Sequence, residues 1–565
     1  MIKTLSPYMK KYGIYAILCP IMVIGEVLLD IFIPLLMSKI VDVGIPLGQQ
    51  TGDISYILKM GLLMIGMAML ALLFGALASR FSAKASMGFG SELRRGLFEK
   101  IQDFSFSNID KFSTASLVTR MTTDVNSAQM AFMMIIRMLV RAPVMLICAT
   151  AMAFAINRSL VTVFLVAIPI LAAGIAIMSV VAFPRFQAML KKYDAMNGSV
   201  QENLISIRVV KAFVRATHEK LKFKRANDDL MHASIRAEKV MIFGMPMMQL
   251  TMYICIVAIL WYGGGMIIEG TMLTGELISF ISYVTQILMS LMMISMVFIM
   301  LVMSQASLKR IAEVLNEQPD ITDAHNDGSV QARDGSVIFD NVSFKYDAGG
   351  EENTLDHINL TIRSGETIGI IGGTGSAKTT LVQLIPRLYD VTEGRLIVGG
   401  HDVRDYKLED LRQAVSMVLQ KNVLFSGTIR DNLKWGDQNA TDQEIIAACK
   451  AAQAYDFVMS FPDGFDTDLG QGGVNVSGGQ KQRLCIARAL LKKPKIIILD
   501  DSTSAVDTAT DAKIRQAFSD SFKDTTAIII AQRITSICDA DRIVVLDDGK
   551  IAGIGTHEEL LQNNE

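Results

Sequence analysis

The sequence predicts a multidomain membrane protein in which a six-helix transmembrane domain precedes a soluble α/β domain. Hydrophobic residues make up 51% of the chain and charged residues only 19%, which is too apolar for a wholly soluble protein. The long apolar runs all lie in the N-terminal half, whereas the C-terminal part alternates short apolar strands with helical patterns. At 565 residues the chain is also too long for one ordinary domain.

Six segments are long and apolar enough to cross about 30 Å of hydrocarbon as helices. They cover residues 14–36, 60–79, 138–156, 159–183, 245–264 and 277–303. A soluble domain of this size would not need six such runs as buried core helices. The first segment follows Lys10 and Lys11 and is too long for the apolar core of a cleavable signal peptide. We therefore expect it to be the first membrane helix.

Basic residues predict which loops face the cytosol, because Lys and Arg are enriched on that side of a membrane protein. The long loops 80–128 and 184–240 contain seven and twelve of them, and the opposite loops contain only Lys39 and Arg158. Those opposite loops are 37–56, 157–158 and 265–274. We expect a multi-pass protein of a cell membrane with both long loops and both termini in the cytosol.

A polar stretch at 316–335, rich in Gly and Asp, predicts a linker between a transmembrane domain (1–315) and an α/β domain (336–565). The net charge of −2 and the lack of a basic stripe in the sequence argue against a nucleic-acid partner. The six cysteines stand at neither CxxC nor zinc-ligand spacing, so we expect them to be reduced and structural.

The segment 366–385, ETIGIIGGTGSAKTTLVQLI, predicts a phosphate-binding loop between a strand and a helix. Backbone N–H groups of such a turn and the helix N-terminus attract phosphate oxygens. Lys378 would neutralise phosphate charge, and the Thr379 hydroxyl would ligate Mg²⁺. The pattern GxxxxGK[ST] is matched except at Ala377, whose methyl group either crowds the loop or is tolerated because the residue is already helical. Taken alone, the segment could be an ordinary glycine-rich turn.

Two further segments support a nucleotide site. The run PKIIILDD (494–501) reads as a buried strand that delivers Asp500 to the sheet edge where α/β proteins bind ligands, and AIIIAQ (527–532) repeats the design with Gln532 at its tip. In NVSGGQKQRLCIARALL (475–491), Ser477 is a good N-cap for a helix. Its Gly-Gly turn could present N–H groups to an anion or simply begin the helix.

These elements, in this order, resemble the ATP-binding cassette (ABC) family. Six spans followed by the cassette on one chain look like a half-transporter of its exporter type, and the resemblance covers essentially the whole sequence. It implies the ABC exporter fold with a P-loop ATPase domain, ATP and Mg²⁺ as ligands, and an ATPase-coupled transporter of a bacterial inner or plasma membrane.

The resemblance also implies roles for single residues. Tyr346 matches the aromatic residue that stacks on adenine, Asp500 the Walker B aspartate, and Gln420 the glutamine that senses Mg²⁺ and faces the membrane domain. The Mg²⁺ ligands would thus be Thr379, Gln420 and Asp500. The Walker A loop is matched by Gly372, Gly373, Thr374, Gly375, Ser376, Ala377, Lys378, Thr379 and Thr380. The signature motif, which completes the ATP site of a second cassette, is matched by Val476, Ser477, Gly478, Gly479 and Gln480.

Other segments resemble the parts of the family that connect domains and subunits. Residues 114–125 and 201–213 look like the intracellular loops that couple cassette and membrane domain. Residues 468–473 resemble the segment that touches those loops, with Gln471 where a glutamate is common. Ser504–Asp507 match the loop that crosses between two cassettes.

Three departures from the family bear on ATP hydrolysis, and one of them is Ala377 in the Walker A loop. Asp501 stands where the family has its catalytic glutamate, and a carboxylate one methylene short can lose ~10²-fold in rate through misplacement. Gln532 stands where the family has its switch histidine, and a neutral amide cannot carry a proton; loss of a general base costs ~10²–10⁴-fold. We expect the site built on Asp501, Gln532 and Gln420 to bind ATP and hydrolyse it slowly.

The intact signature, by contrast, predicts a partner. Ser477, Gly478, Gly479 and Gln480 would complete a site whose Walker residues belong to a second ABC half-transporter, which supplies a glutamate and a histidine. The chain thus resembles the degenerate-site subunit of heterodimeric bacterial multidrug exporters. A homodimer with two weak sites is the alternative.

The sequence is less specific about what crosses the bilayer. The resemblance implies export of lipophilic, drug-like compounds from the cytosol or inner leaflet by alternating access. Alternatives are a lipid or peptide exporter, or an ATP-gated channel or sensor subunit. Met289, Met293 and Met296 could form an adaptable substrate surface or ordinary helix packing. Glu26 and Asp30 share a helix face and could contact substrate or pair with Arg137 or Arg141.

Overall fold

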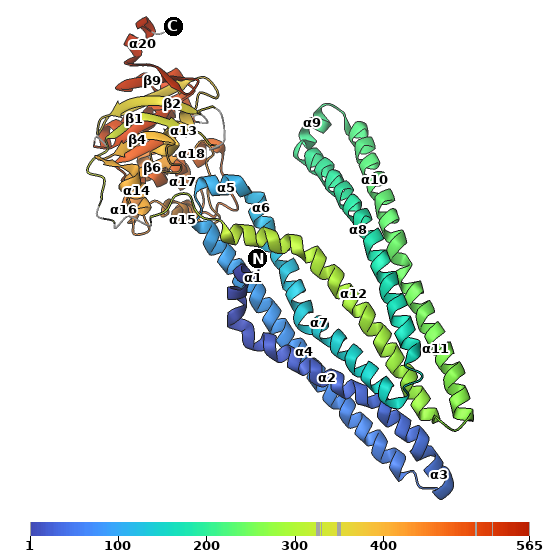
Figure 1. The fold of residues 1–565 in the computed structure, drawn as a ribbon. Helices are drawn as coiled ribbons and strands as arrows, with labels where there is room; N and C mark the ends of the chain where they lie inside the picture. The colour runs from blue at the N-terminus through green and yellow to red at the C-terminus, as the bar shows by residue number, and fades with distance from the viewer. Residues whose placement is uncertain are drawn as a thin grey trace. The chain divides into compact units, whose positions relative to one another are not determined.

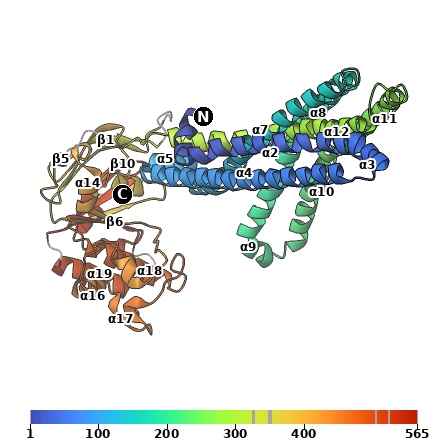
Figure 2. The same cartoon turned by 90° about the horizontal axis from the view of Figure 1, so that it is seen from below.

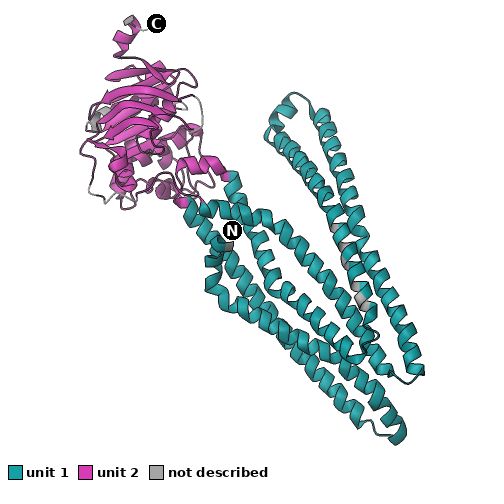
Figure 3. Ribbon diagram, viewed as in Figure 1, with its two compact units in different colours: residues 1–101, 115–316 teal, residues 102–114, 317–565 magenta. Residues whose placement is uncertain are grey.

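The computed structural model of the chain describes residues 2–323, 328, 330–346, 352–502, 506–521 and 524–563. It divides into two compact units (Figure 3). Unit 1 comprises residues 1–101 and 115–316, and unit 2 comprises residues 102–114 and 317–565. The segment 102–114 therefore groups with the C-terminal α/β part, although the sequence placed it inside the transmembrane domain.

The six predicted membrane spans are confirmed. Among the described residues, six helical stretches are long and apolar enough to cross a membrane: Lys3–Thr51, Ser55–Gln102, Thr114–Ile156, Pro169–Ile205, Ala216–Ile268 and Thr274–Asn316. The second of them has 48 residues, which at 1.5 Å per residue gives a length of about 72 Å. Such a helix is more than twice as long as the hydrocarbon layer is thick, so it extends well beyond the bilayer.

Unit 1 is entirely helical (Figures 1 and 2). Its elements are α1 (Ile2–Leu5), η1 (Ser6–Tyr12), α2 (Gly13–Lys39), η2 (Ile40–Gly44), α3 (Ile45–Thr51), α4 (Ser55–Gln102), α6 (Thr114–Thr119), η3 (Arg120–Asp124), α7 (Val125–Ile156), α8 (Thr162–Ile205), α9 (Ile207–Ala212), α10 (Ala216–Ile242), α11 (Gly244–Ile268) and α12 (Thr274–Asn316). Helices α2, α7 and α12 pack together, and α8 runs alongside α10 and α11.

Hydrogen bonds between helices fix the packing of α12 on α2 and on η2, which follows α2. The Tyr283 hydroxyl donates to the Ile31 carbonyl at 2.7 Å, the Ser279 hydroxyl donates to the Pro34 carbonyl at 2.5 Å, and the backbone N–H of Gly275 donates to Asp42 Oδ1 at 2.6 Å. Water competes poorly for such groups inside a bilayer, so polar contacts of this kind contribute to helix association there.

Unit 2 contains two sheets. The larger has the strand order β10-β9-β3-β8-β7-β6, in which all neighbours are parallel except β10. The smaller is antiparallel, with the order β2-β1-β4-β5. The strands are β1 (Val337–Phe344), β2 (Leu355–Ile362), β3 (Thr367–Gly372), β4 (Glu393–Val398), β5 (His401–Asp402), β6 (Val415–Val418), β7 (Ile496–Asp500), β8 (Thr526–Ile530), β9 (Arg542–Asp547) and β10 (Lys550–Gly555).

The parallel strands carry the predicted site residues. Strands β7 and β8 are buried along their whole length, which explains why they read as continuous apolar runs. Because β3, β8 and β7 are adjacent and parallel, their carboxyl ends meet at one edge of the sheet. The residues that follow these strands are therefore brought together.

Helices complete unit 2. They are α5 (Phe106–Phe112), α13 (Lys378–Leu384), η4 (Val403–Asp405), α14 (Leu408–Ala414), α15 (Ile429–Leu433), α16 (Asp442–Ala451), α17 (Tyr455–Met459), η5 (Gly464–Asp466), α18 (Gly478–Leu491), α19 (Thr508–Ser521), η6 (Ile534–Ser536) and α20 (His557–Asn563). Helix α12 ends at Asn316 and β1 begins at Val337, and the described residues between them form neither helix nor strand. The predicted crossing loop 504–507 lies partly outside the described residues.

Candidate ATP site and membrane cavities

The predicted phosphate loop joins β3 to α13 at the sheet edge. Gly375 has a φ of 89°, a conformation that glycine adopts readily and that other residues rarely adopt. Ser376 is buried, and its hydroxyl donates to the Gly373 carbonyl at 2.9 Å. The loop is thus a tight turn held by its own side chain, and α13 begins directly after it.

Of the two alternatives for Ala377, the structure excludes the one in which the residue is already helical. It precedes α13 and has a φ of 66° and a ψ of 24°, which is the left-handed region. A residue with a Cβ in that region is less stable by roughly 1–2 kcal/mol. Because alanine stands where the family has glycine, the backbone is strained at the residue that precedes α13.

Replacing Ala377 with glycine is expected to stabilise unit 2 by roughly 0.5–1 kcal/mol, because relief of the strain exceeds the extra entropy of an unfolded glycine. The measurement is the thermal unfolding midpoint seen by Trp435 fluorescence in full chain carrying Trp261→Phe, since these are the two tryptophans. Ala447→Gly, at an exposed interior position of α16, is the control and should lower the midpoint. A lower unfolding midpoint for Ala377→Gly than for the unsubstituted chain would contradict the inference that Ala377 is strained.

Lys378, Thr379 and Asp500 meet at this edge. The Thr379 hydroxyl donates to Asp500 Oδ1 at 3.1 Å, and Lys378 Nζ donates to the Gly372 and Gly373 carbonyls at 2.9 and 2.7 Å. Burial lowers the pKa of Lys378, an effect that the nearby carboxylates oppose. Burial, with a smaller effect from Asp501, raises the pKa of Asp500. A hydroxyl beside a buried carboxylate is a donor set that suits Mg²⁺, which would also relieve the cost of burying that charge.

Asp501 lies beside two amides instead of a histidine. Its Oδ2 accepts from Gln532 Nε2 at 2.8 Å and from Gln420 Nε2 at 3.4 Å, and the residue is 8% exposed with a φ of 49°. The structure thus brings together the three residues that the sequence placed at the catalytic position. Neutral amides satisfy the carboxylate without offering a group that titrates near neutral pH.

Tyr346 and the signature occupy other parts of unit 2. Tyr346 is 52% exposed, and its hydroxyl lies 3.0 Å from Thr380 Oγ1, which leaves ring surface for a base. Ser477 caps α18, as predicted: its hydroxyl accepts from the Gln480 N–H at 3.3 Å, and Gln480 Oε1 accepts from the Ser477 N–H at 2.8 Å. In the described part of the chain, no hydrogen bond or ion pair joins residues 476–480 to residues 372–380.

In unit 1, the predicted acidic pair binds an arginine. Arg141 of α7 donates to Glu26 Oε1 and, at 3.1 Å, to Asp30 Oδ2. Arg141 also lines a cavity of about 210 Å³ together with Met289 and Met293 of α12. Met296 is 62% exposed and is not among the residues lining that cavity. The structure therefore places two of the three predicted methionines beside the charged cluster.

Comparison with known proteins identifies the family. The models for the ABC transporter transmembrane region and for the ABC transporter match residues 16–292 and 355–504. A protein of Bacillus subtilis (strain 168) named "Uncharacterized ABC transporter ATP-binding protein YfiB" is 40% identical over 566 residues, which cover 100% of this chain and 97% of that protein. This chain belongs to the ABC transporter family.

Two further similarities describe the kind of ABC transporter. The "ATP-dependent lipid A-core flippase" of Syntrophus aciditrophicus (strain SB) is 35% identical over 83% of this chain and 78% of that protein. The solved structure of a bacterial Atm1-family ABC exporter with ATP bound has a TM-score of 0.82 over 99% of this chain and 97% of that chain, at 24% identity, so it shows the fold. The protein therefore has the ABC exporter fold and is an ATPase-coupled membrane transporter of the ABC family whose C-terminal domain binds ATP.

Part of the first predicted cytosolic loop belongs to the same unit as the candidate ATP site. The sequence pointed to residues 114–125, but helix α5 (Phe106–Phe112) is the part of that loop that groups with the ATP-binding unit. Asp110 Oδ2 accepts from the Tyr389 hydroxyl at 2.6 Å, and Lys111 Nζ donates to Glu317 at 2.8 Å. The sequence feature that could have predicted this helix is the capping box formed by Ser105 and Asn108.

Tyr389 connects α5 to Tyr346, the residue predicted to stack on adenine. Its ring meets the Tyr346 ring edge-on, with centroids 5.2 Å apart, and lies 6.1 Å from the Phe106 ring. Burial, reinforced by Asp110, raises the pKa of Tyr389 well above its usual range. The hydroxyl therefore stays protonated at physiological pH and continues to donate to Asp110.

Tyr389→Phe is expected to reduce the substrate moved per ATP hydrolysed by on the order of tenfold. The substitution keeps the ring and removes a hydrogen bond to a charged group, which contributes roughly 1.5–3 kcal/mol. Dye transport and phosphate release in the same vesicles measure this ratio. Tyr406→Phe is the matched control, because its hydroxyl donates to the Val398 carbonyl in the core of unit 2. An unchanged ratio for Tyr389→Phe would show that Tyr389 does not couple.

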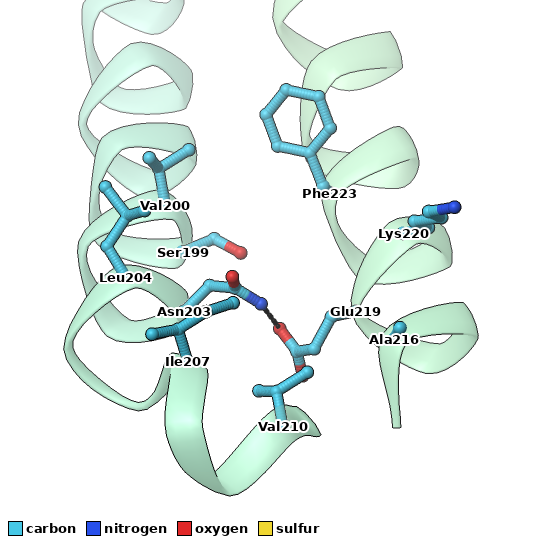
Figure 4. A pocket seen from close by; sticks show the side chains of 10 residues that line it. All are labelled: Ser199, Val200, Asn203, Leu204, Ile207, Val210, Ala216, Glu219, Lys220 and Phe223. Carbon is cyan, nitrogen blue, oxygen red and sulfur yellow. Dashed lines mark hydrogen bonds between the residues drawn. The ribbon is translucent and has the colours of Figure 1, made fainter. Parts of the chain in front are cut away.

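The second predicted coupling segment, 201–213, forms the turn from α8 through α9 to α10. Asn203 Nδ2 donates to Glu219 Oε2 at 3.0 Å across this turn (Figure 4). The ten labelled side chains line a cavity of about 360 Å³. Val209 and Phe213 are exposed at the turn. An exposed apolar turn is suited to packing against another protein surface.

Proposed function

We propose that this ABC exporter is one half of a heterodimer that moves lipophilic compounds, drug-like molecules among them, out of the cytosol or inner leaflet by alternating access. Its own Walker site binds MgATP and hydrolyses it slowly. Its signature completes the active site of the partner, which contributes a glutamate and a histidine. The observation that carries this proposal is the carboxylate of Asp501, which lies between the amides of Gln532 and Gln420.

The residues of this chain would act as follows. Tyr346 stacks on the adenine, Lys378 neutralises the phosphates, and Thr379 with Asp500 holds Mg²⁺, with Gln420 nearby. The metal supplies charge neutralisation at the transferring phosphate. Ser477 and the N–H groups at the start of α18 face the nucleotide of the partner cassette. ATP joins the two cassettes, and the coupling helices pass the motion to the membrane helices.

The loop charges support an orientation with both termini and both long loops in the cytosol, in the plasma membrane of a bacterium. With the exported compound leaving the inner leaflet, this orientation places the ATP sites on the side where ATP is available.

Lipid transport is a second candidate, favoured by the similarity to the lipid A-core flippase and by the charged cluster in unit 1. Charged residues at membrane depth usually contact a cavity, a partner or a substrate. A lipid headgroup would bring opposite charges to such a cluster, whereas a neutral drug would not.

An ATP-dependent dye gradient in vesicles that contain this chain and its genomic neighbour tests the proposal. We expect accumulation with both chains and little with either chain alone. Dye movement that follows its gradient without ATP hydrolysis would favour a channel. Equal transport by this chain alone would overturn the heterodimer.

A further inference from the structure

A cavity of about 540 Å³ lies in unit 1 between α2 and α4, with one residue of α7 in its wall. Glu26 and Asp30 contribute from α2, Arg137 from α7, and the α4 side consists mainly of small residues such as Gly75. Leu72 and Ala76 of α4, which also line it, are exposed, so the cavity opens at the surface of the helices. Its volume is that of ~18 water molecules at about 30 Å³ each, which is more than a bare ion needs.

The carboxylate of Glu26 is only half satisfied. Oε1 accepts from Arg141, but Oε2 is buried and has no hydrogen-bond partner among the described residues. A Cβ on Gly75 would lie 3.1 Å from Oε1 and 3.4 Å from Oε2, so the glycine at this position lets the carboxylate pack directly against α4. An unsatisfied buried carboxylate oxygen costs free energy, and a donor from a ligand would remove that cost.

Arg137 is a second side chain of the cavity that lacks a partner among the described residues. It is half-buried on α7, one turn before Arg141, and no hydrogen bond or ion pair joins it to the described part of the protein. Arginine at membrane depth is stable only when it reaches water, a lipid headgroup or an anion. Within the described residues, the cavity therefore presents an acceptor without a donor and a cation without an anion.

We propose that this cavity binds the zwitterionic headgroup of an amphiphile, with a primary ammonium at Glu26 Oε2 and a phosphate at Arg137. The proposal rests on the transport function above and names its substrate class. Glu26, Asp30, Arg137 and Arg141 sum to zero formal charge, so a ligand with one net charge would leave Glu26 or Arg137 unmet. A quaternary ammonium has no N–H to donate, so it satisfies Oε2 less well than a primary ammonium. The apolar chain leaves over Leu72 and Ala76.

Binding to the purified full chain without nucleotide tests this directly. The probes are dodecylphosphoethanolamine, dodecylphosphocholine, dodecylammonium, dodecyl phosphate and free phosphoethanolamine, and the readout is Kd by thermophoresis in a non-ionic detergent. We expect dodecylphosphoethanolamine to bind at least tenfold more tightly than each of the other four. If dodecylammonium and dodecyl phosphate bound as tightly as dodecylphosphoethanolamine, the site would not require a zwitterionic headgroup and the proposal would be wrong. If free phosphoethanolamine bound as tightly as dodecylphosphoethanolamine, the apolar chain would contribute nothing and the ligand would not need to be an amphiphile.

Variants tie the affinity to the two residues. Glu26→Gln and Arg137→Met are each expected to weaken dodecylphosphoethanolamine at least tenfold, whereas Glu269→Gln and Arg158→Met, outside the cavity, are not. Because Glu26→Gln also disturbs Arg141, Arg137→Met keeps the test valid if the first variant fails to fold. Unchanged affinity in Arg137→Met would overturn the site. Binding is measured without ATP, so failure of dye transport and failure of this site are separate outcomes.

Discussion

The double substitution Asp501→Glu and Gln532→His is expected to raise the ATPase rate of the self-paired chain by about 10²-fold or more. At present the Asp501 carboxylate accepts from the amides of Gln532 and Gln420, at 2.8 and 3.4 Å. A glutamate carries its carboxylate one methylene further, and a histidine can hold or release a proton near neutral pH. The measurement is phosphate release at saturating MgATP by purified chain in lipid nanodiscs.

Two controls accompany this experiment. Asp501→Asn should leave the slow rate of the unmodified chain unchanged, because that carboxylate contributes little as a base. Adding Lys378→Met to the double substitution should abolish the gained rate, because it removes the cation that holds the phosphates at this Walker loop. Rapid phosphate release by the unmodified chain that disappears in Asp501→Asn would show that Asp501 is an effective base.

Ser477→Ala in this chain is expected to reduce the ATPase rate of the co-purified heterodimer by roughly 10²–10³-fold, the usual cost of removing one donor at a developing charge. Lys378→Met in the same chain should cost about tenfold or less, because it damages only the slow site. The measurement is the steady-state ATPase rate of each variant paired with the unmodified partner. Equal losses would show that the two sites are equivalent, and the opposite ranking would show that the Walker site of this chain is the faster one. Either result would contradict the proposed pair of sites.

Ser477 also caps α18, so its removal lowers stability by about 1 kcal/mol independently of catalysis. Thr441→Ala is the matched control. Thr441 caps α16 with the same reciprocal pair of hydrogen bonds, here with Glu444, and the sequence gives that helix no role at the nucleotide. We expect the two variants to unfold at similarly lowered temperatures while only Ser477→Ala loses ATPase activity.

The ATP-binding residues could be predicted because their chemistry is local in sequence. A buried parallel strand is a continuous apolar run, and the residue at its carboxyl end faces the ligand edge of the sheet. The runs before Gly372, Asp500 and Gln532 therefore identified three neighbouring strands before their order was known. The N-cap role of Ser477 could likewise be predicted, since capping depends on residues three positions apart.

The conformation of Ala377 and the grouping of α5 with unit 2 could not be predicted in this way. Whether residue 377 lies inside the helix or just before it depends on where α13 begins, and helix ends are set by hydrogen bonds that composition does not fix. Helix α5 contacts the rest of unit 2 through Asp110 and Tyr389, which are 279 positions apart in the chain and whose side-chain oxygens lie 2.6 Å apart. A contact at this separation in sequence leaves no local pattern.

The sequence by itself determined six membrane helices and an ATP-binding cassette, because each follows from composition or short-range pattern, and the same patterns carry our prediction of its catalytic residues. Only the tertiary structure decided that Arg141 pairs with Glu26 and Asp30, while Arg137 lines the cavity without an ion pair to any described residue. Both arginines lie on α7 one turn apart, so either could have reached the acids. The choice depends on how α2 packs against α7, which is a long-range property of the fold.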